Sequence, residues 1–212
     1  MAGGDPKLAR LLEHPAIWRG RSAARKSGLS TGFAALDELL PDKGWPRTGL
    51  IEILVSRFGS GELSLLLPAL AALTRTAAAR WCIWVAPPLM PFAPALVRRG
   101  VVLERVAVVG GARPVWAFEQ TLGSGACDAV LAWAARPRLR ELRRLQLAAE
   151  RGRTLGVLFR PRHVARESSA AVLRLALEPR PNGARITLLK GRSARRDALD
   201  LSLEDEPTCV RA

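Results

Sequence analysis

A short loop in the first third of the chain has the position and some of the residues of a phosphate-binding site. The apolar run 50–55 leads directly into Ser56-Arg57-Phe58-Gly59-Ser60-Gly61-Glu62-Leu63. Loops that cradle phosphate read G-x-x-x-x-G-K-[ST]: backbone N–H groups hold the phosphate, the lysine neutralises it and the hydroxyl binds Mg²⁺. Here Ser56, Glu62 and Leu63 stand at the first glycine, the lysine and the hydroxyl residue, and only Gly61 matches. The pattern predicts a degenerate loop that holds no nucleotide cofactor.

Two residues of this region argue against ATP binding. Glu62 places a carboxylate where triphosphate oxygens would lie, and like charges about 4 Å apart cost roughly 4 kcal/mol at an effective dielectric constant near 20. Pro68 falls within the helix expected after the loop, where proline removes a backbone hydrogen bond and kinks the axis. We therefore expect both ATP repulsion and a distorted helix N-terminus.

Arginine is concentrated in one part of the chain. From Arg136 to Arg166 there are ten arginines against two glutamates, within a protein of net charge +14. A basic cluster of this density indicates a polyanion such as nucleic acid, or an acidic protein partner. The alternative is an ordinary solvated face in a sequence rich in Ala and Arg.

Other chemistries find little support in the sequence. The three cysteines, Cys82, Cys127 and Cys209, have no C-x-x-C spacing, and His14 and His163 lie far apart, so neither a disulfide framework nor a metal site is expected. The N-terminus does not resemble a signal peptide, and the most apolar window, 63–73, is too short to span a membrane. These features predict a soluble, cytoplasmic protein.

Apolar runs of strand length alternate with amphipathic segments along the chain, which predicts an α/β fold with a mostly parallel sheet covered by helices on both faces. The expected strands are 50–55, 81–85, 106–109, 128–133 and 154–159, and the expected helices are 33–40, 92–99, 114–122 and 139–150. Two further strands, 171–177 and 184–190, flank a Pro/Asn-Gly turn typical of an antiparallel hairpin at the sheet edge. The predicted organisation is an N-terminal arm with a short helix (1–28), one core domain (29–190) and a polar tail (191–212).

The segment LSTGFAALDELLPDKGWPRTGLIEI, which begins at Leu29, resembles the start of the RecA core, where a similar S-T-G-x-x-x-L-D segment, a glycine-rich turn and a V-E-I strand precede the phosphate loop. The Gly44-Trp45-Pro46 turn, the degenerate loop and the ending Leu188 to Arg192 resemble the ImuA family, RecA-like accessory proteins of bacterial translesion DNA synthesis that are often grouped with SulA-like cell-division inhibitors. The resemblance extends as a pattern to about Lys190.

The resemblance implies that the catalytic positions are not retained. The catalytic glutamate after the second strand would fall in Ala86-Pro87-Pro88, and the Mg²⁺-coordinating acid would fall at about Trp133. The polar residue that senses the γ-phosphate would fall in Phe159-Arg160-Pro161. Because hydrolysis needs metal and charge neutralisation together, the resemblance implies a pseudo-ATPase with no catalytic residues; a working ATPase with an unorthodox site is the weaker alternative.

Two loops that face DNA in the RecA family correspond to residues 135–139 and 160–169. On this basis the candidate DNA-binding residues are Arg136, Arg138, Arg160, Arg162 and Arg166. Contacts made mainly to phosphates predict little sequence preference and a steep salt dependence. His163 lies among them and is expected to be a loop residue.

The resemblance also implies partner proteins. Tryptophans at strand positions (Trp81, Trp84, Trp133) are expected in the core, whereas Trp18, Trp45 and Trp116 are candidate contacts. The candidate partner-binding residues are Leu8, Leu11, Leu12, Trp18, Trp116, Arg192, Arg195 and Arg196. The expected role is a non-catalytic scaffold of translesion synthesis in the SOS DNA-damage response, binding the ImuB polymerase-like adaptor and DNA or RecA, and through ImuB an error-prone polymerase. The alternative is a SulA-like inhibitor that binds the division protein FtsZ.

Overall fold

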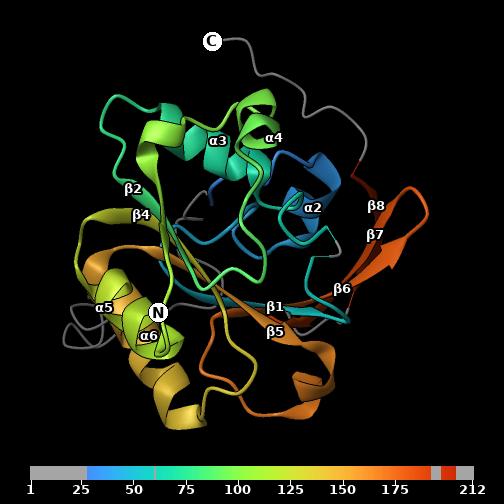
Figure 1. Ribbon diagram of the computed structural model, residues 1–212. Helices are drawn as coiled ribbons and strands as arrows, with labels where there is room; N and C mark the ends of the chain where they lie inside the picture. Colours follow the sequence, from blue (N-terminus) through green and yellow to red (C-terminus); the bar gives the residue numbers. More distant parts are fainter. Residues whose placement is uncertain (1–27, 60, 192–196, 204–212) are drawn as a thin grey trace, which may run out of the picture.

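A single eight-stranded sheet forms the centre of the molecule, in the order β3-β2-β4-β5-β1-β6-β7-β8 (Figure 1). This computed structural model describes residues 28–59, 61–191 and 197–203. The six strands from β3 to β6 run parallel, and β7 and β8 run antiparallel to their neighbours. The predicted α/β class is therefore confirmed. None of the helices in these residues is long and apolar enough to cross a membrane.

The central strand β1 (Gly49–Val55) is buried along its whole length. It lies between β5 (Leu155–Pro161) and β6 (Leu173–Arg180), both parallel to it. A continuous apolar run suits a strand covered on both faces. Glu52 interrupts the run and is nevertheless fully buried, so the fold must provide its carboxylate with partners.

Three strands extend the sheet beyond β5: β4 (Cys127–Trp133), β2 (Trp81–Val85) and the edge strand β3 (Val106–Val109). Their bounds agree with the predicted strands to within one residue. Trp84 and Trp133 are buried as expected, whereas Trp81, at the start of β2, is 42% exposed and does not belong to the core.

Helices cover both faces of the sheet (Figure 1). On one face lie α2 (Ala34–Leu39), α3 (Leu67–Arg75) and α4 (Ala93–Arg98), with the short 3-10 helix η1 (Leu103–Arg105). On the other face lie α5 (Pro114–Gly123) and α6 (Leu139–Gly152), packed against each other and the strands. The 3-10 helix η2 (Arg162–Arg166) follows β5.

The C-terminal part forms an antiparallel extension of the sheet. The predicted hairpin is present as β6 and β7 (Gly183–Lys190), and β8 (Ala198–Ser202) pairs with β7 to form the edge. The prediction of a polar tail from residue 191 is thus wrong for residues 198–202. Leu201 is buried and anchors this strand.

The segment that opens the core is held by local hydrogen bonds. The backbones of Leu29 and Trp45 pair in both directions at 2.7 Å, and the Asp37 carboxylate accepts bonds from the Thr31 backbone N–H and the Ser30 hydroxyl, both at 2.8 Å. Trp45 is completely buried beside these residues, so its prediction as an exposed contact is wrong. The Gly44-Trp45-Pro46 turn is therefore a packing element of the core.

Candidate functional site

The degenerate phosphate loop is closed by its own glutamate. Glu62 is only 2% exposed, and its Oε1 accepts a hydrogen bond from the Gly59 backbone N–H at 2.8 Å. The same oxygen accepts a bond from the indole Nε1 of Trp133 at 3.3 Å. A loop N–H of the kind that would hold a phosphate oxygen is thus bound to a carboxylate of the protein itself.

The helix after this loop begins later than the sequence suggests. α3 begins at Leu67, so Pro68 lies in its first turn, where a missing N–H breaks no helical hydrogen bond. The prediction that Pro68 kinks the helix interior is therefore wrong. Residues 61–66 form turns between the loop and α3, so the helix N-terminus does not follow Gly61 directly as it does in a phosphate-binding loop.

Aromatic side chains occupy the part of the sheet next to Glu62. Trp133, the last residue of β4, stacks on Phe159 of β5 with ring centroids 4.7 Å apart and an interplanar angle of 24°. Trp84 of β2 lies at 6.2 Å from Trp133 in a tilted arrangement. All three side chains are at most 6% exposed. An apolar cluster therefore fills the place where the resemblance to RecA would position a metal-binding acid.

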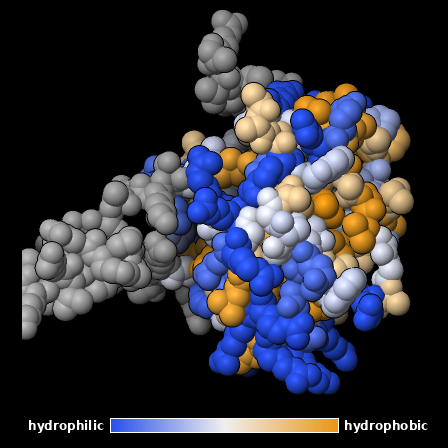
Figure 2. Space-filling model, turned by 90° about the vertical axis from the view of Figure 1, so that its left-hand side faces the viewer, coloured by the Kyte–Doolittle hydropathy of each residue, from blue (hydrophilic) through white to orange (hydrophobic). Residues whose placement is uncertain are grey.

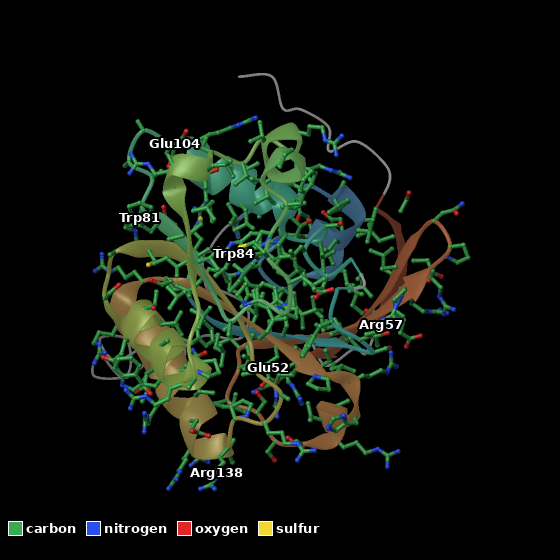
Figure 3. All side chains as sticks on the ribbon, viewed as in Figure 1. Glu52, Arg57, Trp81, Trp84, Glu104 and Arg138 are labelled. Carbon is green, nitrogen blue, oxygen red and sulfur yellow. The ribbon has the colours of Figure 1, made fainter. Side chains whose placement is uncertain are left out.

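Beneath η2, charged residues form a buried network across three adjacent strands. Glu52 of β1 accepts hydrogen bonds from Arg160 Nη1 of β5 at 3.1 Å and from Arg174 Nε of β6 at 2.6 Å (Figure 3 labels Glu52). Arg160 also pairs with Glu167 at 2.9 Å, and Arg174 donates to the backbone carbonyls of Val164, Ala165 and Glu167. The network fixes the segment that follows β5 to the sheet.

Arg160 is consequently unavailable to DNA, because it is 1% exposed and its charge is already paired with Glu52. Its prediction as a DNA-binding residue is wrong. Arg162 is partly exposed and pairs with Glu178 of β6. Arg136, Arg138 and Arg166 are exposed, as is His163. The loops after the paired strands β4 and β5 do lie at the same end of the sheet, as expected.

Of the predicted partner-binding residues, only Trp116 lies within the described residues. It is 49% exposed on α5, and the guanidinium of Arg113 lies 4.6 Å from its ring centroid. The other candidates fall outside the described part of the chain: Leu8, Leu11, Leu12, Trp18, Arg192, Arg195 and Arg196.

Sequence reasoning missed an exposed apolar loop between β2 and α4. Leu89, Met90 and Phe92 are 73%, 79% and 67% exposed. The available signal was the run Ala86-Pro87-Pro88-Leu89-Met90-Pro91-Phe92, in which large apolar residues stand between prolines rather than in a strand or helix. Such adjacent exposure of large apolar side chains is typical of protein-binding surfaces.

Nucleophilic and metal chemistry have no evident site in the described residues. Burial raises the pKa of the Cys82 thiol to about 12, and burial likewise raises the pKa of Cys127, so both thiols stay protonated near neutral pH. Within the described residues, no three His, Cys, Asp or Glu side chains lie close enough together to hold a metal ion.

Comparison with known proteins finds similarity to SulA proteins in sequence and in structure. Over 96 residues, 44% of this chain, the sequence is 33% identical to the cell division inhibitor SulA of Photorhabdus laumondii subsp. laumondii. The match covers 54% of that protein, so the chain spans about half the length of the curated relative it matches. The crystal structure of SulA from Pseudomonas aeruginosa superimposes with a TM-score of 0.45 and 24% identity, over 52% of this chain and 97% of that one. No protein-family model matches the chain.

Proposed function

We propose that this chain is a non-catalytic, SulA-like protein that restrains cell division by binding FtsZ. The observation that carries the proposal is the apolar loop 86–92, exposed in a chain that is 33% identical to a cell division inhibitor over 96 residues. Glu62, bound within its own loop, supports a function that needs no nucleotide.

The loop is suited to binding because it is stiff. Ala86 begins it in the left-handed region with φ of 49°, and Pro87, Pro88 and Pro91 fix further backbone angles. Preorganised side chains lose less conformational entropy on association, so exposed apolar groups on a rigid loop bind more tightly than on a flexible one. Leu89, Met90 and Phe92 would form the central contacts, and exposed Arg98 and Arg99 at the end of α4 would lie at the polar rim.

The interaction is tested by light scattering of FtsZ assembly with GTP and increasing amounts of the full chain. We expect the unchanged protein to halt assembly at near-stoichiometric amounts, and Leu89→Ser/Phe92→Ser to require more than about tenfold higher concentrations, since buried apolar anchors dominate interface energies. The matched control is Leu147→Ser/Val172→Ser, which removes exposed apolar residues elsewhere. Equal loss in both variants, or no effect of the unchanged protein, would overturn the proposal.

A prediction about nucleotide follows from the closed loop. The purified chain should hydrolyse ATP no faster than buffer, because Glu62 occupies the Gly59 N–H and adds a negative charge to the site. Phosphate release and equilibrium binding of labelled ATP measure this. ATP hydrolysis that is lost in both Gly61→Ala and Glu62→Gln would show that the loop is catalytic after all.

A second candidate is the translesion scaffold that binds an ImuB-type polymerase-like protein. The observation in its favour is the exposed arginine-rich surface, which inhibition of FtsZ does not require. Pull-downs of tagged chain with FtsZ and with an ImuB-type protein discriminate the two: capture of the second protein with unaffected FtsZ assembly would favour the scaffold.

A further inference from the structure

The outward side of α6 presents a row of arginines. Arg140, Arg143 and Arg151 are exposed, on the side opposite to Leu142 and Leu145, which pack against the sheet. At 100° per residue these arginines fall within one stripe of the helix, which also contains Arg144 and Leu147. Figure 2 shows hydrophilic residues gathered over the lower part of the molecule, where α6 lies.

The row has a regular, extended form. Arg151 lies eleven positions after Arg140, which corresponds to about 17 Å along the helix at 1.5 Å per residue. Exposed Arg136 and Arg138 continue it beyond the N-terminal end, and Figure 3 shows Arg138 at the end of α6, on the opposite side of the molecule from Glu104. The positive charge is therefore distributed along the length of α6 and is not concentrated at one place.

The acidic residues of α6, Glu141 and Glu150, form no ion pair with the arginines of this row in the described residues. Glu141 accepts a hydrogen bond from the Arg138 backbone N–H at 2.6 Å, and Glu150 accepts one from Gln146 Nε2 at 2.7 Å. Arg144 pairs with Glu119 of α5. In the part of the chain that the structure describes, no ion pair is formed by the side chains of Arg136, Arg138, Arg140, Arg143 or Arg151.

This distribution works against the stability of the helix. Positive charge near the N-terminus opposes the helix dipole, and Arg140 repels Arg143 and Arg144 one turn away. Only Arg151, in the last turn, interacts favourably with the dipole. Arg140 and Arg143 therefore do not stabilise the fold, and their charges, which form no ion pair in the described residues, are available to an external anion.

We infer that the outward side of α6 binds the phosphate backbone of double-stranded DNA. Each strand of duplex DNA presents one phosphate per 3.4 Å of the helix axis, so a row of about 17 Å has the axial length of about five phosphates of one strand. Guanidinium groups bind phosphate oxygens in bidentate fashion. No aromatic residue lies in the row, so stacking on single-stranded bases is not provided for. The apolar side of α6 is buried on the sheet, which removes the face that a membrane-binding helix would insert. This surface differs from the FtsZ-binding loop and stands independently of it.

The test measures fluorescence anisotropy of labelled 20-base-pair duplexes of two unrelated sequences, titrated with the full chain at several salt concentrations. Arg140→Gln/Arg143→Gln/Arg151→Gln keeps good helix formers at each position. We expect equal affinity for both duplexes, a loss of about tenfold or more at 50 mM salt in the variant, and a salt slope reduced by about 2.7, since each phosphate contact contributes about 0.9.

The matched control is Arg98→Gln/Arg99→Gln/Arg105→Gln, which removes three exposed arginines near α4 and lowers the net charge equally. It should retain the affinity of the unchanged protein. An equal loss in both variants would show that net charge alone drives binding, and tighter binding of single strands or of phosphatidylserine vesicles than of duplex would also overturn the inference. Thermal melting separates folding from binding: the α6 variant should melt at the same temperature as the unchanged protein or higher.

Discussion

Glu52→Gln should lower the free energy of unfolding by about 3–5 kcal/mol, the usual cost of removing one partner from a buried ion pair. For a chain of this length that corresponds to a melting temperature lower by about 6–20 °C. The Glu52 carboxylate is fully buried and accepts bonds from Arg160 at 3.1 Å and Arg174 at 2.6 Å. Glutamine preserves the shape of the side chain but leaves two guanidinium groups, 1% and 5% exposed, without their shared counter-charge.

Glu52→Gln should destabilise the segment after β5 in addition to lowering the stability of the whole fold. Arg174 donates to three backbone carbonyls between Val164 and Glu167, so its displacement would release η2 from the sheet. Hydrogen exchange should therefore speed up in residues 162–169 before the rest of the core. Thermal and urea unfolding give the global value.

The control is Glu38→Gln, which removes an exposed carboxylate paired with Lys43 and should cost no more than about 1 kcal/mol. If Glu52→Gln and Glu38→Gln unfold at the same temperature and urea concentration, the buried network contributes nothing to the free energy of unfolding. Replacing Glu52, Arg160 and Arg174 together by Leu, Met and Met leaves no uncompensated buried charge, but it also removes the bonds from Arg174 to three backbone carbonyls, so exchange in residues 162–169 should speed up in this variant too.

The buried network depends on contacts between residues far apart in the sequence, which local patterns do not predict. The predicted strands 81–85 and 106–109 have the observed bounds, because an apolar run of strand length can be recognised from the local sequence alone. The burial of Arg160 depends on Glu52, which lies 108 residues earlier in the chain. The one local signal was an acid within an otherwise apolar strand, which indicates a partner but does not identify it.

Other differences have similarly physical causes. The position of Pro68 within α3 depends on where the helix begins, and the turns of residues 61–66 delay that start. The strand at 198–202 carries only two large apolar residues, Leu199 and Leu201, too short an alternation to separate an edge strand from a polar tail. The helical period places Arg140 and Arg143 of α6 opposite its apolar residues, whereas the resemblance to RecA implies DNA contacts from the adjacent loops only.

Trp133→Ala should cost about 3–5 kcal/mol, as for other buried aromatic residues truncated to alanine. The indole stacks on Phe159 at 4.7 Å and is 6% exposed, so its removal leaves a cavity beside Trp84 and Phe159. It also takes away the donor to Glu62 Oε1 at 3.3 Å. Thermal and urea unfolding should show a much larger loss than in Trp116→Ala, which removes a half-exposed indole from α5.

Trp133→Phe separates the two contributions, because it keeps an aromatic ring against Phe159 but has no N–H for Glu62. We expect a smaller loss of about 1–3 kcal/mol, since the buried carboxylate loses one of its hydrogen-bond donors. Neither variant should gain ATP binding, because the negative charge of Glu62 stays in the loop and still accepts from Gly59 at 2.8 Å. If instead Trp133→Ala unfolded like the unchanged protein and bound ATP, the aromatic cluster would be a removable cover over an intact nucleotide site. In that case the loop and the aromatic cluster would block access to a nucleotide site that is still present, and they would not have replaced it.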